Sequence, residues 1–285
     1  MYLSCLLIDV GSNPDRPRPG RLLLRNLYRV HQRLCMAFPS TERKDKDPQF
    51  LDPYRSNDFG GQQRLFTESA NEIHKTKRKD VHAPRDGNQG FLYRIDPQPG
   101  CGRALILVQS AVKPDWDYAF QNAGHLLAVP PEVKPFNPQF QLNQRLRFRI
   151  LANPVRKVSS KSLDFAGKPF DERWKGKDVP VPTADLDKWL QRRAEPAWSA
   201  PENSEDKQSR PGFRLAEITD IQSGYIYVNK GLNRDSSRRL RSVRYEGILV
   251  VTDADTFCNT LARGIGPGKA FGFGLISVTS EFPPP

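Results

Sequence analysis

Cysteine is scarce in this chain. The 285 residues include four, namely Cys5, Cys35, Cys101 and Cys258. No two of them have the CxxC spacing that many zinc sites share, and they are too scattered for the disulfide framework of a small secreted domain. We therefore expect reduced thiols and no metal site, and nothing in the sequence requires a cofactor.

Long apolar runs are also lacking. The N-terminal stretch MYLSCLLIDV has no basic residues in front of its apolar part, and it is too short to span a bilayer. The stretch therefore does not fit a secretion signal or a membrane span. We expect a cytoplasmic protein.

Acidic residues are in deficit. The chain has 32 Asp and Glu against 44 Lys and Arg, which gives a formal net charge of +12 and a pI near 9.7. Such an excess favours a polyanionic partner, most simply a nucleic acid, because each neutralised phosphate releases condensed counterions. The alternative is a basic surface that binds no such partner.

The apolar residues that are present, 37% of the chain, follow the periods of strands and helices. In the first part they predict strands over 2–10, 90–96, 103–111 and 125–133, a helix over 26–38 with Asn26 as N-cap, and a short helix over 116–124. This order is that of a small ferredoxin-like domain over residues 1–130. The polar stretch at about 40–90 predicts a poorly packed insertion.

The proline-rich segment 131–139 predicts a linker, and residues 140–285 predict a second domain. The expected elements are an alternating strand from residue 140, a basic loop over 156–177, a helix from Thr183, strands near 212–230 and 243–252 joined by an arginine-dense connection, a helix over 252–263 and a last strand. The predicted fold class is α+β, with two tandem ferredoxin-like (RRM-like) domains, each an antiparallel sheet backed by helices.

Five glycines fall within residues 264–274, in the stretch GIGPGKAFGFGLISV. The spacing fits neither a Walker loop nor a Rossmann fingerprint, because three residues separate Gly264 from Gly268 and Lys269 stands where a third Rossmann glycine belongs. Two explanations stay open. The stretch is either an irregular turn after a helix, or a loop in which Gly264, Gly266, Gly268 and Lys269 contact phosphate.

This C-terminal arrangement of a helix, the glycine-rich stretch and a last strand resembles the glycine-rich loop of the CRISPR repeat-RNA endoribonucleases. Five further segments resemble the CasE family in the same order, namely MYLSCLLI, LYRVHQRL, VQSA, RFRILANPVRKV and VRYEGILVVTDAD. The resemblance covers most of the chain outside 40–90 and 199–211. It implies processing of CRISPR transcripts as a subunit of type I-E Cascade.

Tyr28 and His31 lie at i and i+3, so they share one face of the first helix. That face is expected to turn away from the core stripe, and on the residues alone such a histidine can equally be a satisfied surface residue. The resemblance implies that the two are the active-site pair. The implied reaction needs no metal: the RNA 2′-hydroxyl attacks the adjacent phosphate, His31 serves as general acid or base, and Tyr28 orients the phosphate or assists proton transfer. The products are a 2′,3′-cyclic phosphate and a 5′-hydroxyl.

The family usually places basic residues just before the helix of the second domain, where this chain reads WKGKDVPVPT (174–183). Lys177 matches one of them and is expected in the catalytic site. Asp178 and Pro182 stand where basic residues are expected. Either Lys175 or Lys168 supplies the missing charge, or the enzyme is slow.

The expected contacts with the RNA stem come from the basic loop and the arginine-dense connection, although such charge runs are often merely solvated. The residues are Arg156, Lys157, Lys161, Lys168, Arg173, Lys175, Arg234, Arg238, Arg239 and Arg241. The resemblance implies as partners the CRISPR repeat RNA hairpin, which is kept after cleavage, and other Cascade subunits, and we expect a monomer in isolation. The alternatives are a catalytically impaired RNA-hairpin-binding subunit and an unrelated tandem RRM protein, for which the aromatic strand motifs are lacking.

Overall fold

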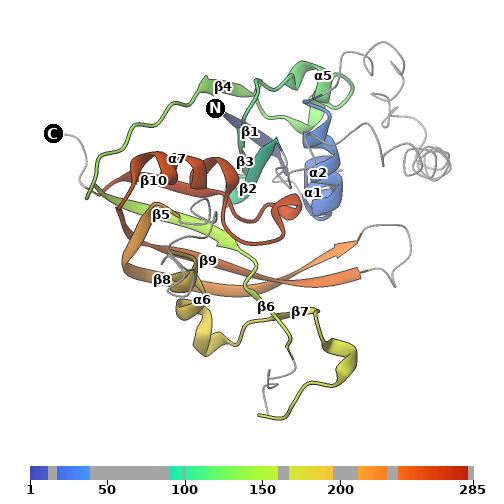
Figure 1. Cartoon of the computed structure of the whole chain (residues 1–285). Helices are drawn as coiled ribbons and strands as arrows, with labels where there is room; N and C mark the ends of the chain where they lie inside the picture. Colours follow the sequence, from blue (N-terminus) through green and yellow to red (C-terminus); the bar gives the residue numbers. More distant parts are fainter. Residues whose placement is uncertain are drawn as a thin grey trace. The chain divides into compact units, whose positions relative to one another are not determined.

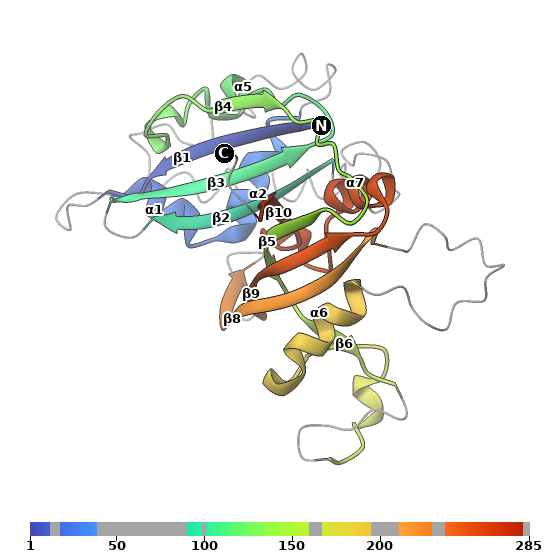
Figure 2. The ribbon, with the colours of Figure 1, turned by 90° about the vertical axis from the view of Figure 1, so that its left-hand side faces the viewer.

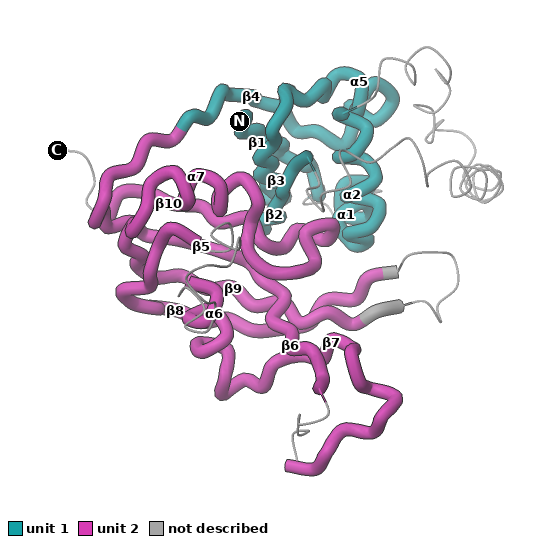
Figure 3. The backbone as a smooth tube through the Cα atoms, viewed as in Figure 1, with its two compact units in different colours: residues 1–137 teal, residues 138–285 magenta. Residues whose placement is uncertain are grey.

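The computed structural model describes residues 1–11, 18–38, 90–98, 101–159, 167–194, 211–229 and 237–281. The chain divides into two compact units, Met1–Asn137 and Pro138–Pro285 (Figure 3). The polar stretch expected as an insertion at about 40–90 lies, except for its last residue, outside the described residues. None of the described helices is long and apolar enough to cross a membrane.

Unit 1 is a four-stranded antiparallel sheet with helices packed against it. Its strands follow the order β2-β3-β1-β4, and β1, β3 and β2 lie side by side in Figure 2. The elements are β1 (Tyr2–Asp9), α1 (Pro19–Leu24), α2 (Leu27–Cys35), β2 (Phe91–Gln98), β3 (Arg103–Ser110), α5 (Trp116–Phe120), the 3₁₀ turn η2 (Gly124–Leu126) and β4 (Glu132–Pro135). This order is the ferredoxin-like arrangement that the sequence predicts.

The core of unit 1 follows from alternation along its strands. Leu6 and Ile8 of β1 and Ile106 of β3 point to one face, where they meet Val30 and Leu34 of α2. Burial of each such side chain contributes about 1.5–3 kcal/mol. This packing holds α2 against the sheet and thereby sets the position of the residues on its other sides.

The last strand of unit 1 begins later than the sequence predicts. The strand expected over 125–133 is replaced by η2, a single bridge between Leu127 and Ile8, and then β4, whose pairing with β1 begins at Glu132. Pro130 and Pro131 have no N–H to donate to a ladder, which accounts for the delay. Strand β4 consequently occupies part of the segment 131–139 that was expected to be a linker.

Unit 2 repeats the arrangement. Its strands follow the order β10-β5-β9-β8, all antiparallel. The elements are β5 (Arg145–Ala152), β6 (Val155–Lys157), the 3₁₀ turn η3 (Glu172–Trp174), β7 (Asp178–Pro180), the 3₁₀ turn η4 (Thr183–Asp185), α6 (Leu186–Ala194), β8 (Phe213–Asn229), β9 (Ser237–Val251), α7 (Ala254–Arg263), the 3₁₀ turn η7 (Lys269–Phe271) and β10 (Ile276–Ser280). The predicted class, two ferredoxin-like sheets backed by helices, is confirmed.

Two features of unit 2 extend beyond its sheet (Figure 1). Strand β9 pairs with β5 only from Val243 onward, so residues 237–242 form a two-stranded ribbon with β8 alone. Part of the arginine-dense segment expected as a connection is therefore strand. The second feature is the short ribbon of β6 and β7, in which Arg156 pairs with Val179 and Lys157 with Asp178. Most of the predicted basic loop lies between these two strands.

Candidate functional site

Helix α2 carries Tyr28 and His31 in unit 1. The helix begins where the sequence predicts, because the Asn26 side chain accepts hydrogen bonds from the backbone N–H groups of Tyr28 (3.1 Å) and Arg29 (3.4 Å). Such a cap satisfies donors that the first helical turn leaves unpaired. Tyr28 and His31 are both partly exposed, whereas Val30 between them is buried in the core.

The helical spacing predicts that the His31 side chain turns away from the core. In the structure it turns away only in part. Its ring centroid lies 5.7 Å from that of Phe91 and 6.5 Å from that of Tyr93, and the Tyr93 ring is nearly parallel to it, at 16°. Both aromatic residues belong to β2 and are buried. The imidazole therefore packs against these two aromatic rings, which limit its motion and leave part of it exposed.

Two neighbours of His31 differ in what they can do chemically. Burial raises the pKa of the Tyr93 hydroxyl far above its usual value, and the hydroxyl lies 3.4 Å from the Leu27 carbonyl oxygen. It therefore stays protonated and serves as packing. Cys35, one helical turn after His31, is exposed and places its Sγ 3.6 Å from the His31 Nε2. The i, i+4 spacing could have suggested this contact. The two aromatic rings belong to a strand 60 residues away in sequence, so the sequence of the helix could not predict them.

The basic residues between β6 and β7 belong to unit 2. Arg156 and Lys157 lie on β6, Lys168 lies in the return segment, and Lys161 lies outside the described residues. Arg173 and Lys175 pair with Asp171 (3.3 Å) and Glu172 (3.8 Å). These ion pairs are exposed, so each contributes less than about 1 kcal/mol and can be exchanged for a phosphate. Lys177 instead places its Nζ 5.5 Å from the centroid of the Trp174 ring.

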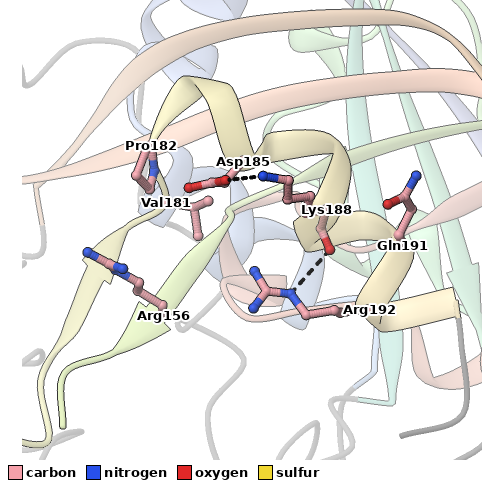
Figure 4. A pocket seen from close by; sticks show the side chains of 7 residues that line it. All are labelled: Arg156, Val181, Pro182, Asp185, Lys188, Gln191 and Arg192. Carbon is pink, nitrogen blue, oxygen red and sulfur yellow. Dashed lines mark hydrogen bonds and ion pairs between the residues drawn. The ribbon is translucent and has the colours of Figure 1, made fainter. Parts of the chain in front are cut away.

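A polar cavity of about 440 Å³ opens between β6 and α6 (Figure 4). Its lining carries three cationic side chains, Arg156, Lys188 and Arg192, against one carboxylate, Asp185. Asp185 accepts a 3.0 Å hydrogen bond from the Lys188 Nζ, and the Arg192 Nε donates to the Lys188 carbonyl. The net positive lining suits a phosphate. Lys188 and Arg192 are absent from the sequence-based prediction, although they lie at i, i+4 on the predicted helix.

Pro182 lines this cavity too, and Asp178 lies on β7, next to Lys177. Neither position therefore adds positive charge beside the basic residues of this part of unit 2.

The arginines of β9 take different roles, although Arg239 and Arg241 lie two residues apart and therefore share one face of the strand. Arg239 is exposed, with its guanidinium 4.1 Å from the Tyr225 ring centroid. Arg241 is 6% exposed, and its guanidinium donates to the Val181 carbonyl (2.6 Å) and the Thr183 hydroxyl (2.7 Å). This burial argues against the predicted RNA contact of Arg241 and assigns it a role in holding 181–183 on β9. Arg238 lies on β9, and its side chain is not among those described. Arg234 lies outside the described residues.

The glycine-rich loop has a structural explanation. All five glycines have positive φ, between +71° and +90°. A Cβ on Gly268 would lie 2.8 Å from the Phe273 ring, and one on Gly274 would lie 2.8 Å from the Ile265 carbonyl oxygen. Only glycine adopts this backbone in so little space at low cost. The turn that follows α7 thus accounts for Gly264, Gly266 and Gly268 without a ligand.

Lys269 in this loop is half-buried. Burial is the main cause that lowers the pKa of its ammonium, and the nearby Arg263 lowers it further. A bound anion would reduce the repulsion between two cations that lie close together in a partly desolvated place. This part of the phosphate prediction stays open.

Comparison with known proteins places the chain in a family. The family described as "CRISPR associated protein" matches residues 62–280. The chain is similar to the CRISPR-associated endoribonuclease Cse3 of Thermus thermophilus, with 33% identity over 218 residues, 73% of this chain and 88% of the relative. It is also similar to the Cascade subunit CasE of Escherichia coli K12, with 26% identity over 196 residues, 68% of this chain and 83% of the relative.

A solved structure of Thermus thermophilus Cse3, bound to an RNA representing a pre-cleavage complex, agrees in fold. The TM-score is 0.58 at 26% identity, covering 98% of each chain. The resemblance drawn from the segments of the sequence is thereby confirmed. The chain belongs to the CRISPR-associated protein family, in the group that contains Cse3 and CasE.

Proposed function

We propose that this chain is a metal-independent endoribonuclease of the cytoplasm. In this proposal it binds the stem-loop of CRISPR repeat RNA, cleaves the precursor beside the stem, and keeps the hairpin as a Cascade subunit. The relatives named as the endoribonuclease Cse3 and the Cascade subunit CasE support it, as do the solved structures of Cse3 bound to RNA.

The observation that carries the catalytic proposal is the placement of His31. Its imidazole is partly exposed and rests on the rings of Phe91 and Tyr93. The reaction forms a bond between the 2′-oxygen and phosphorus and breaks the bond from phosphorus to the 5′-oxygen. One proton leaves the 2′-hydroxyl and one reaches the leaving oxygen. His31 transfers one of these protons, since the ordinary pKa range of histidine spans neutral pH.

Tyr28 precedes His31 by almost one helical turn, and its hydroxyl is proposed to orient the phosphate. The positive charge for the transition state is assigned to Lys177 of unit 2. The RNA stem is held by phosphate contacts from the β6–β7 ribbon, from the cavity lined by Arg156, Lys188 and Arg192, and from Arg239 on the β8–β9 ribbon. Such contacts read the shape and backbone of a duplex.

The test is single-turnover cleavage of the repeat hairpin in EDTA, with binding measured in parallel. His31→Ala is expected to slow cleavage by about 10²–10⁴-fold, the usual contribution of a positioned proton-transfer group, while the Kd for the hairpin stays unchanged. His125→Ala is the matched control, because His125 is an exposed histidine of the same unit, on η2. An RNA with a 2′-deoxy nucleotide at the cleavage position should bind and remain uncut.

A second candidate is the catalytically impaired hairpin-binding subunit. It is favoured by Asp178 and Pro182, which put a carboxylate and an uncharged ring where basic residues are expected. Wild-type protein that binds the hairpin tightly and does not cut it would establish this candidate. In that case Asp178→Lys is expected to raise the cleavage rate, since it replaces a negative charge beside Lys177 with a positive one.

A further inference from the structure

Trp174 lies outside any core. Its side chain is 40% exposed, whereas Trp116 and Trp189 are each 4% exposed. Trp174 ends the short turn η3, between β6 and β7. An indole left this open gains little from burial, so the fold by itself does not explain a tryptophan at this position.

The segment Trp174–Lys177 is a β-turn held in place from both sides. The Lys177 N–H donates to the Trp174 carbonyl at 2.9 Å, Lys175 has φ −56° and ψ 129°, and Gly176 has φ +75°. These are the features of a type II turn, whose third position favours glycine. Val158 on the other side of the ribbon exchanges two backbone hydrogen bonds with the turn, one with Gly176 (2.9 Å) and one with Lys177 (3.0 Å). The two ends of the turn are thus fixed with respect to each other.

The turn presents an aromatic ring and a cation together. The Lys177 Nζ lies 5.5 Å from the centre of the indole, within the range of a cation–π contact. The carboxylates of Asp171 and Glu172 are engaged by Arg173 and Lys175. Among the described residues, Lys177 forms no ion pair. Its ammonium is therefore available to an anion that approaches the ring.

We propose that this turn is a nucleobase-binding site for one unpaired nucleotide of the RNA substrate. The Trp174 indole stacks on the base, and Lys177 contacts a phosphate one sugar away. Base pairing hides the faces of bases inside a stem, so the site takes a nucleotide outside the duplex. Stacking accepts every base, because each has a π-face. The proposal rests on the proposed function, in which Lys177 meets the scissile phosphate, and it places the stacked base beside the cleavage position.

The experiment uses the full chain and two RNAs. The first is the repeat stem-loop with unpaired nucleotides on both sides of the cleavage position, a 2′-deoxy block at that position, and 2-aminopurine at one flanking nucleotide at a time. The second is the bare stem-loop. For the wild type we expect quenching of 2-aminopurine at one flanking position. Trp174→Ala is expected to abolish the quenching and to weaken binding of the first RNA by about 5- to 150-fold, without affecting the second.

Two further variants complete the test. Trp174→Phe keeps a ring and should retain the quenching and most of the affinity, which separates stacking from any folding defect of the alanine variant. Leu142→Ala is the matched control, since it also truncates an exposed apolar side chain of the same unit, with Leu142 67% exposed. It should change neither quenching nor affinity.

Three outcomes would overturn the stacking site. They are no quenching at any flanking position, equal weakening of both RNAs by Trp174→Ala, and no effect of Trp174→Ala on either RNA, which would leave the exposed indole to a protein partner. Failure of the proposed function looks different, because the wild-type chain would then either not bind the bare stem-loop or bind it without cutting an RNA that carries the 2′-hydroxyl.

Discussion

Replacement of Gly274 by alanine tests why the chain places five glycines after α7. Gly274 has φ +90°, a conformation that costs a residue with a Cβ at least about 1–2 kcal/mol. The added Cβ would lie 2.8 Å from the Ile265 carbonyl oxygen, a backbone atom that cannot rotate away. Relief requires a shift that weakens the hydrogen bond from the Ile265 N–H to the Gly274 carbonyl, now 2.9 Å, at about 1 kcal/mol.

The expected loss for Gly274→Ala is therefore about 2–3 kcal/mol of the free energy of unfolding of unit 2. Two glycines of the same unit serve as graded controls. Gly167 has φ +75° with open space around it, so Gly167→Ala should cost about 1–2 kcal/mol for the backbone alone. Gly224 lies in β8 with open space and no positive φ, so Gly224→Ala should be neutral or gain about 0.5–1 kcal/mol.

The assay is urea unfolding followed by tryptophan fluorescence, with hairpin affinity measured below the transition. The order of stability should be Gly224→Ala, then Gly167→Ala, then Gly274→Ala. If Gly274→Ala were as stable as Gly224→Ala and yet lost RNA affinity, the turn explanation would be refuted. The glycines would then serve close approach to phosphate instead.

Two other predictions concern single side chains of unit 2. Arg241→Met should lower the free energy of unfolding by about 1–3 kcal/mol, because the Val181 carbonyl and the Thr183 hydroxyl lose their donor. The control Arg239→Met, at an exposed position, should change the free energy of unfolding by no more than about 0.5 kcal/mol. Equal urea midpoints for the two variants would contradict this prediction. Lys269→Met should be more stable than the wild type at pH 7, because a lysine whose pKa is lowered by burial and by Arg263 penalises the fold while it is charged. That advantage should shrink as the pH rises through the folded-state pKa toward 10.5, and an advantage that is constant with pH would exclude the charge as its cause.

Local features of this chain were readable from its residues. The Asn26 cap involves groups two and three residues apart, so the start of α2 needed no knowledge of the rest of the fold. The alternation along β5, with Phe148 and Ile150 inward and Arg149 between them outward, likewise follows from the pleat of a strand. The prolines before Glu132 carried the signal for the late start of β4, although the strand was expected earlier.

Features that depend on distant segments were not readable. Arg239 and Arg241 are two residues apart on the same face of β9, and nothing in their local sequence distinguishes them. Residues 181–183 cover Arg241 and leave Arg239 exposed. In the same way, the aromatic rings that pack against His31 belong to β2, far along the chain.

Periodicity, motif order and helical spacing are properties of neighbours along the chain, so the residues alone were enough to predict the fold class, the family and the placement of Tyr28 and His31 on one helix. Packing between distant segments settles which cations stay at the surface, why the loop after α7 needs glycine, and that Trp174 stands beside Lys177 on a fixed turn. Those outcomes depend on which segments pack together, and burial and close approach exist only once the chain has folded.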